Sequence, residues 1–589
     1  MFRKNEQHLQ MPLLSGLNEL PEKLKDQLEQ SWAGTFYEEI FVRIDEEIYA
    51  PLYADEPSRP NIPVNVLVGL EMMKDGNGWS DQEMHENYSF NIQVRYALGV
   101  RNLGEEHFDL RTMYNFRQRL SQHMQETGEN LIERTFEQVT DEQIAAYALE
   151  TNQQRMDSTQ ISSNIREMSR LQLLVEVLQR VHRELRPEDQ ATWAEEFSPY
   201  LKGSSGQYLY RIKGRGAHQP HLVAIGGLMQ RLVDALADDY AQSPVYQMLA
   251  RVFTEHFRLE ETDVQPKAGS ELRADSLQSP DDLLASYRQK GDEGYIGYVA
   301  NATETCHPDN DFQLIVKMQT EPNTAEDADM LAEAVPDLKK RTELDQMHTD
   351  GAYGSPAGDA VLAEHGVELH QSAIRGRQPN PDKFNLADCQ WELDEDRNPV
   401  AVVTPHGERV AVEPGRAPDR YILRFGQAQT AAQQPPPAPE ASSASPCQPE
   451  PAPPDTPPPP EKPAPPPVLY CSRQQIDLAL RRQRCAQLRT ADHNPRPAIE
   501  ATMGALKRPF GNDKLPVRGH FRMAVVMLGS AAMVNLRRIW RFQVEKRKEE
   551  AKKLKDAASK SPLFQFFSRQ IASFLRYPYS VVGFNLLHP

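Results

Sequence analysis

The sequence predicts an α/β protein with a layered core. Two runs rich in β-branched and aromatic residues, 294–303 and 312–320, are separated by a polar turn that contains proline, which is typical of a hairpin. Helical patterns and short strands then alternate, at 325–340, in the residues before Asp350, at 356–365 and at 367–371. Because strands and helices alternate in this way, we expect a sheet covered by helices.

Three helical patterns precede this core, at 64–74, 81–88 and 111–120. The third carries cations and aromatic residues together: Arg111, Arg117 and Arg119 with Tyr114 and Phe116. A compact helical module with a basic third helix can place that helix in the major groove of DNA. In the alternative interpretation, Tyr114 and Phe116 belong to the core and the arginines face solvent. We expect a helical N-terminal domain over residues 1–140.

Several long helices are also expected between residues 166 and 260, where apolar residues recur at helical spacing around a break at 202–206. This insertion suits either DNA or a second subunit as its partner. Just before it, residues 156–164 place Asp157 in a short run rich in hydroxyl groups. Residues 153–157 form a poor strand by propensity.

Residues 493–507 carry an acid between two cations on one predicted helical face. Pro497 suits the first turn, and nothing from 498 to 507 breaks a helix. Arg496, Glu500 and Lys507 stand at i−4, i and i+7, so a carboxylate and two phosphate-seeking cations share one stripe. Such a stripe can hold a metal ion and a nucleic-acid backbone. The alternative is a solvated helix with an i, i+4 ion pair.

A third acid, Asp350, stands in residues 348–355 at a strand end marked by glycine. An acid at the carboxyl end of a strand, before a loop and a helix, is where α/β folds build their sites. The alternative is an ordinary Asp-Gly turn.

Taken together, these segments resemble a DDE transposase of a bacterial insertion sequence. The runs 156–159, 349–353 and 499–502 stand in the order of the three acids of that family. Arg496, Glu500 and Lys507 reproduce most of the Tyr-Arg-Glu-Lys signature of one subgroup, and His493 departs from it, since it stands where the signature has Tyr. Residues 88–99 and 108–120 are similar to the helical N-terminal domain common in these transposases. The resemblance covers most of the chain outside its insertions.

The resemblance implies an RNase H-like catalytic core with helical and β insertions, preceded by an all-α N-terminal domain. It also implies that Asp157, Asp350 and Glu500 are the catalytic acids, and the place of Asp157 rests mainly on it. Three converging carboxylates repel one another, and their hard oxygens select Mg²⁺ or Mn²⁺. We expect two ions, which would support in-line phosphodiester displacement on DNA. Arg496 and Lys507 would orient the backbone.

The expected partners are double-stranded DNA, as the terminal inverted repeats of the element and as target, and a second copy of the chain, because two DNA ends must be joined. Two rival functions remain open. One is a metal-dependent nuclease that uses the same acids without strand transfer. The other is a degenerate, non-catalytic DNA-binding protein, which His493 and a proline-rich insertion favour and the intact acids oppose.

Charge is distributed unevenly along the 589 residues, whose formal net charge is −18. Residues 496–560 hold 16 Lys or Arg and 6 Asp or Glu, and Arg537 and Arg538 belong to this cationic run. Such charges are usually only solvated, but for this run we expect contact with a DNA backbone about equally. The apolar run 523–536 is short for a membrane span and is typical of a buried helix.

The proline-rich stretch 427–468 holds 17 of the 46 prolines and is expected to be a disordered tether. It separates a small β subdomain, expected within 389–425, from a helix at 474–489. The expected parts are therefore 1–140, 141–426, 427–468, 469–545 and a basic, aromatic tail at 546–589. A polar, mixed N-terminus and five scattered cysteines favour a cytoplasmic, nucleoid-associated protein without a membrane segment.

Overall fold

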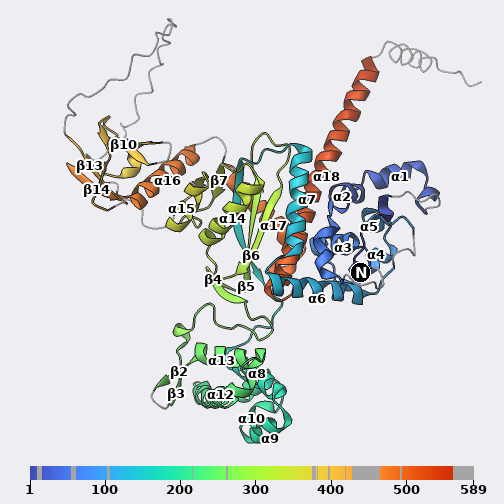
Figure 1. Cartoon of the computed structure of the whole chain (residues 1–589), viewed down its shortest axis with the longest axis vertical. Coiled ribbons are helices and arrows are strands. Elements are labelled where there is room, and N and C mark those ends of the chain that lie inside the picture. The colour runs from blue at the N-terminus through green and yellow to red at the C-terminus, as the bar shows by residue number, and fades with distance from the viewer. Residues whose placement is uncertain are drawn as a thin grey trace, which may run out of the picture. The chain divides into compact units, whose positions relative to one another are not determined.

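The computed structural model in Figure 1 describes residues 1–9, 16–54, 61–102, 107–214, 216–260, 263–374, 380, 382–394, 398–417, 419–426, 465–490 and 494–560. His493, most of the predicted tether and the tail from residue 561 lie outside this part. The chain divides into two compact units. The first unit comprises Met1–Glu150, Ser158–Thr324 and Ala501–Pro589, and the second comprises Thr151–Asp157 and Ala325–Glu500.

The first unit opens with α-helices, and the three predicted ones are confirmed as α3, α4 and α6. Each begins or ends at a residue that suits its position: Ser80 and Glu83 form a capping box on α4, and Gly78 ends α3 in a left-handed conformation. The helices are α1 (Glu22–Glu29), α2 (Trp32–Glu39), α3 (Val64–Asn77), α4 (Asp81–Phe90), α5 (Ile92–Ala97), α6 (Leu110–Thr127) and α7 (Leu131–Tyr147). Short 3₁₀ helices are η1 (Gln7–Leu9), η2 (Gly16–Glu19), η3 (Phe41–Arg43) and η4 (Glu46–Leu52).

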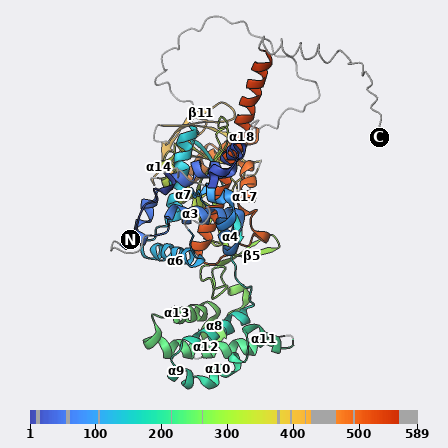
Figure 2. The same cartoon turned by 90° about the vertical axis from the view of Figure 1, so that its right-hand side faces the viewer.

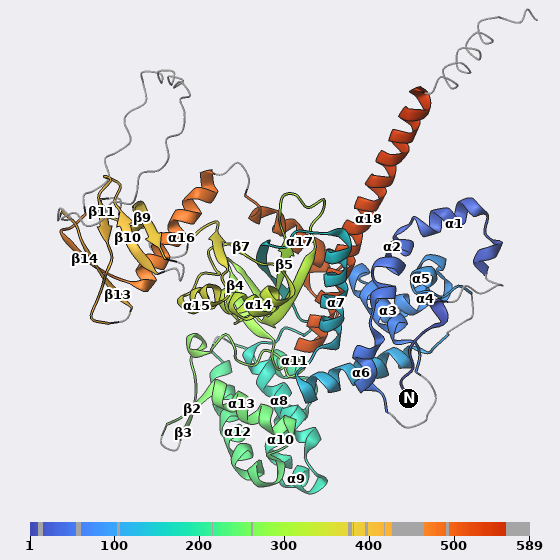
Figure 3. The same ribbon diagram turned by 45° about the horizontal axis from the view of Figure 1, so that its top comes forward.

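The predicted buried helix at 523–536 is confirmed as the first half of α18 (His520–Lys560), which packs against α3 and lies beside α2 and α7 (Figure 3). Gly76 of α3 allows this close approach, because an added Cβ there would lie 2.3 Å from the Cβ of Met533. Asn535 fixes α18 to the sheet by bonding both backbone groups of Ile315, at 2.8 Å each. None of the helices in the described ranges is long and apolar enough to cross a membrane.

The helices predicted between 166 and 260 are also confirmed, and they enclose a core of their own (Figure 2). They are α8 (Arg170–Glu184), α9 (Pro187–Thr192), α10 (Ala194–Leu201), α11 (Ser205–Arg211), α12 (His218–Tyr240) and α13 (Pro244–His256). The predicted break at 202–206 separates α10 from α11. The last residues of the predicted helical range instead form a strand, β2 (Phe257–Glu260), which pairs with β3 (Asp263–Pro266). A short 3₁₀ helix, η5 (Gly269–Glu271), follows.

The strands of the first unit are antiparallel, and the predicted hairpin is present as β5 (Glu293–Thr305) and β6 (Ile315–Pro322). Strand β4 (Ser286–Lys290) also pairs with β5, and β5 pairs with β1 (Gln153–Ser162). Strand β1 is shared between the units, since its residues up to Asp157 fall in the second.

In the second unit the strand order is β1-β7-β8, and all three strands are parallel. The predicted alternation is present as α14 (Asp327–Arg341), β7 (Gln346–Thr349), α15 (Pro356–Glu364) and β8 (Glu368–Gln371). The protein is thus mixed α/β with a helical N-terminal region.

The expected small strands form two three-stranded sheets in the second unit. One consists of β9 (Gln390–Leu393), β10 (Pro399–Val403) and β11 (Arg409–Ala411), and the other of β12 (Glu413–Pro414), β13 (Arg420–Arg424) and β14 (Val468–Ser472). The last residue of the predicted tether, Val468, therefore begins a strand. After η6 (Leu386–Asp388), the later helices are α16 (Arg473–Thr490), η7 (Arg496–Ala498), α17 (Ile499–Lys507) and η8 (Gly511–Asp513).

Candidate active site

Parallel pairing of β1 and β7 determines how two of the predicted acids lie in the second unit. Gln153, Gln154 and Arg155 pair with Gln346, Met347 and His348. Two residues further along the same register, Asp157 stands level with Asp350. Residues two apart on a strand share a face, and neighbouring strands are about 4.8 Å apart. The pairing of β1 with β7 therefore brings Asp157 and Asp350 to the same part of the sheet, although the two residues are far apart in sequence.

Arg496 connects Asp157 to the third acid. Its Nη2 lies 3.3 Å from Oδ2 of Asp157, and its Nη1 donates to Oε1 of Glu500 at 2.7 Å. The Asp157 side chain is 13% exposed and the Glu500 side chain 62%. One guanidinium thus bridges a nearly buried carboxylate and an exposed one, and the i, i+4 ion pair expected in the alternative interpretation of this helix is present.

The backbone before Arg496 is held against β1. Arg155, which is buried and two residues before Asp157, donates from Nη1 to the carbonyl of Pro495 at 2.7 Å. The backbone N–H of Arg496 donates to Oδ1 of Asn494 at 3.1 Å. Sequence reasoning missed Arg155. The alternation of a strand through Asp157 was the signal that could have found it.

Asp350 follows the last residue of β7, where the strand end was predicted. Its Oδ1 accepts a hydrogen bond from the N–H of Ala352 at 2.7 Å, and its carbonyl accepts from Nε2 of Gln371 at 3.2 Å. The Asp-Gly segment is thus also a turn, and the turn fixes the direction of the carboxylate.

Two histidines lie on the strands that precede and follow Asp350. His348 of β7 and His370 of β8 are paired in register, with ring centroids 5.0 Å apart. Burial, with smaller effects of His370 and Arg155, lowers the pKa of His348 to about 4. At neutral pH this imidazole is uncharged, so it places no cation beside the acids.

The donor set fits a hard divalent cation, because Asp157, Asp350 and Glu500 supply carboxylate oxygens. In the part of the chain that the structure describes, however, no three His, Cys, Asp or Glu side chains are grouped closely enough to hold a metal ion. Arg496 is the cation that contacts two of the acids. Glu500 is mostly exposed, so its side chain has room to reorient.

The other predicted DNA contacts lie in the first unit, and several have protein partners. Lys507 pairs with Asp513 at 2.7 Å, and Arg538 pairs with the buried Glu304 at 2.7 Å. Arg537, which is half-buried, donates to the carbonyl of Gly76. His493 lies outside the described residues.

On α6, Arg117 bonds both Glu71 and Asp81 at 2.8 Å, whereas Arg111 and Arg119 are exposed. Tyr114 is 48% exposed and Phe116 is buried. The interpretation of this helix as part of the core therefore holds for Phe116 but not for Tyr114.

The N-terminal part of the chain matches a known family. Residues 24–119 match a family model described as "Transposase domain (DUF772)", and this segment runs from α1 into α6. A search of curated proteins and of solved structures finds no match. The matched domain supports a transposase, a kind of protein that acts on DNA.

Proposed function

We propose that the chain is a DDE transposase that cuts the ends of an insertion sequence and joins them to target DNA. The observation that carries the proposal is the pair of contacts by which Arg496 joins Asp157 to Glu500, with Asp350 directly after β7, the strand that pairs in parallel with β1. The transposase domain match supports the coarser part of the proposal, a transposase, from a different part of the chain.

An RNase H-like core is part of this proposal. Its support is a mixed sheet in which β1 pairs with the antiparallel hairpin strand β5 and with the parallel strand β7. Asp350 follows the carboxyl end of β7, the position where α/β folds build their sites, and Asp157 lies within the neighbouring strand β1.

Asp157, Asp350 and Glu500 would hold the divalent ions, Mg²⁺ or Mn²⁺. Such ions activate the attacking oxygen and stabilise the leaving oxygen of an in-line phosphodiester displacement. The Asp350 turn would keep its carboxylate aimed at the site. Arg496 would turn part of its guanidinium from the acids to the scissile phosphate, because a planar fork suits a phosphodiester. Water would attack first and release a 3′-hydroxyl, which would then attack target DNA.

The partners in this proposal are the terminal inverted repeats, target DNA in the nucleoid and a second copy of the chain. Arg111 and Arg119 are the cations of α6 that remain exposed for DNA. Arg117 and Arg538 contribute less, because internal carboxylates already neutralise their charges.

The test is cleavage and strand transfer of a labelled DNA end with Mg²⁺, Mn²⁺ or EDTA. The wild-type chain should cut and join the end only with a metal, and Asp350→Asn should do neither. Asp345→Asn is the matched control, since Asp345 is 61% exposed and stands just before the same strand. Cleavage without joining would indicate a nuclease, and binding without cleavage would indicate a non-catalytic DNA-binding protein.

A further inference from the structure

The first unit contains a cavity of about 810 Å³ to which neither the acids nor the proposed chemistry assigns a role. Its lining comes from α3, α4 and α6, from Asn164 and from the start of α18 with the residues before it. Small-molecule sites have volumes of about 300–1,000 Å³. The cavity is therefore large enough for a ligand the size of one nucleotide.

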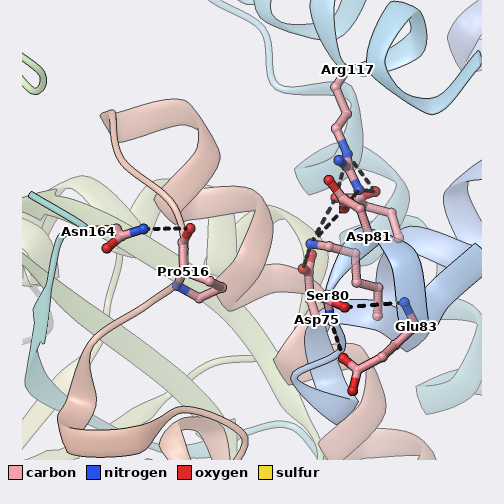
Figure 4. A network of polar contacts seen from close by, with 9 residues as sticks. Asp75, Ser80, Asp81, Glu83, Arg117, Asn164 and Pro516 are labelled. Carbon is pink, nitrogen blue, oxygen red and sulfur yellow. Dashed lines mark hydrogen bonds and ion pairs between the residues drawn. The ribbon is translucent and has the colours of Figure 1, made fainter. Parts of the chain in front are cut away.

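One wall is a network of charges on the three helices, shown in Figure 4. Arg117 bonds Glu71 and Asp81, and Lys74 pairs with Asp75 at 2.9 Å. Lys74, Glu71 and Asp75 have side chains that are 7%, 6% and 2% exposed. Arg117 and Lys74 bond these acids, although the buried Oδ2 of Asp75 has no hydrogen-bond partner among the described residues, so the cations of this wall are held by protein groups rather than available to a ligand.

Another wall is the segment 516–518, and it is also anchored. Asn164 donates from its backbone N–H to the carbonyl of Val517 at 2.8 Å, and from Nδ2 to the carbonyl of Pro516 at 3.2 Å (Figure 4). The N–H of Gly519 donates to Oδ2 of Asp282 at 2.8 Å. Both walls are fixed by the fold, so the cavity between them is formed in advance of any ligand.

The lining combines aromatic rings with cations. Trp79, Tyr114 and Phe521 supply the rings, and Tyr114 is about half exposed. Arg518 and Arg522 are exposed as well, and Arg518 pairs with Asp281 at 3.3 Å. The lining thus carries two cations outside the network wall, Arg518 and Arg522, and Asp281 offsets the charge of Arg518.

We propose that this cavity binds one unpaired nucleotide of a DNA strand, with its base against Trp79 and Tyr114 and its phosphate at Arg518 and Arg522. Aromatic side chains stack on nucleobases, and arginine forms bidentate hydrogen bonds with phosphate. In a duplex, both faces of each internal base are covered by its neighbours. Only an unpaired or extruded base presents a face to these rings. The proposal shares with the proposed function only the premise that DNA is the substrate.

The experiment uses the full chain and measures dissociation constants by fluorescence anisotropy. The probes are a blunt DNA duplex and the same duplex with three unpaired thymidines at one end. Tyr114→Ala and Arg522→Gln should each weaken binding of the tailed duplex about tenfold, within the range expected for one stacking or phosphate contact, and leave the blunt duplex unchanged.

Matched controls are Tyr210→Ala, an exposed tyrosine of the helical insertion, and Arg273→Gln, an exposed arginine outside the cationic run 496–560. Both should bind the two probes as the wild type does. Equal binding of the tailed duplex by wild type, Tyr114→Ala and Arg522→Gln would overturn the proposal, as would equal affinity for abasic and thymidine tails.

A deoxythymidine trinucleotide separates this proposal from the transposase proposal, because it cannot be cut or joined as an element end. It should quench tryptophan fluorescence in the wild type and much less in Trp79→Phe. This result would stand even if the wild-type chain showed no cleavage. If a tetraglutamate peptide quenched Trp79 as strongly as the trinucleotide, the cavity would be assigned to an acidic peptide and the proposal would be wrong.

Discussion

Replacing Arg496 by methionine should have opposite effects on metal binding and on DNA joining. The guanidinium contacts Asp157 and Glu500, two of the three acids proposed to bind divalent ions. A divalent cation placed among the acids competes with this guanidinium for the same oxygens and is repelled by its charge. Arg496→Met removes both effects while keeping an unbranched side chain of similar length.

The magnitude follows from the two contacts. The pair with Glu500 joins an exposed carboxylate at i, i+4, and such pairs are worth about 0.3–0.5 kcal/mol. The contact with Asp157 is 3.3 Å long but reaches a side chain only 13% exposed, so about 1.5 kcal/mol is appropriate for a hydrogen bond to a charged group. Together they amount to about 2 kcal/mol, which corresponds to a roughly 30-fold change in affinity.

The assay is calorimetric titration of the full chain with Mn²⁺. Arg496→Met should bind Mn²⁺ about 10- to 30-fold more tightly than the wild type, and it should join labelled DNA ends more slowly. Arg473→Met is the control, because it breaks another i, i+4 pair of the second unit, with Asp477. Mn²⁺ affinity that is unchanged or weaker in Arg496→Met would refute the view that this arginine competes for the acids.

Three further predictions concern stability, measured by urea denaturation of the full chain. Gly226→Ala should destabilise the helical insertion by about 1–3 kcal/mol, because the new Cβ would lie 2.6 Å from the Phe257 ring. Gly227→Ala, on the same helix, is the control. Its Cβ would meet nothing closer than 3.8 Å, so this substitution should be neutral or stabilising. Burial lowers the pKa of His256 from 6.5 to about 4. As pH falls, the unfolded chain therefore takes up the His256 proton before the folded chain does. The free energy of unfolding should be constant above about pH 6.5 and should fall by about 3 kcal/mol between about pH 6.5 and about pH 4. His256→Leu should remove this loss. Arg117→Met leaves the buried Glu71 without its guanidinium partner and should cost about 3–5 kcal/mol, while Arg111→Met, on the exposed side of α6, should cost less than about 0.5 kcal/mol.

Local patterns predicted those elements whose sequence and environment agree. The hairpin β5–β6 is rich in β-branched and aromatic residues, and helix α4 begins at a capping box, so short-range physics determines both. Strand β1 is different. Its first half buries Gln154, Arg155 and Asp157, residues of low strand propensity, because parallel pairing with β7 holds this half in a strand. Tertiary pairing overrides local preference there.

The small sheets illustrate a second limit. Strand β14 begins at Val468 and pairs with β13, although the proline-rich stretch separates the two in sequence. Composition did not predict that the last residue of that stretch joins a sheet with residues on its other side. Such long-range pairing depends on which strand edge is available in the folded chain, and local sequence patterns do not show this.

The candidate site combines both kinds of information. The pair between Arg496 and Glu500 follows from helical spacing alone, whereas the contact of Arg496 with Asp157 joins residues 339 positions apart. That contact depends on Arg155, which holds the carbonyl of Pro495 against β1. With Asp157, Asp350, Glu500 and Arg496 all ionised, the formal charge of the site is −2. Without the arginine it would be −3, because the guanidinium that contacts both Asp157 and Glu500 would be gone. In the absence of metal, Arg496 therefore serves as a counter-ion for Asp157 and Glu500. It would already lie beside these acids when DNA binds.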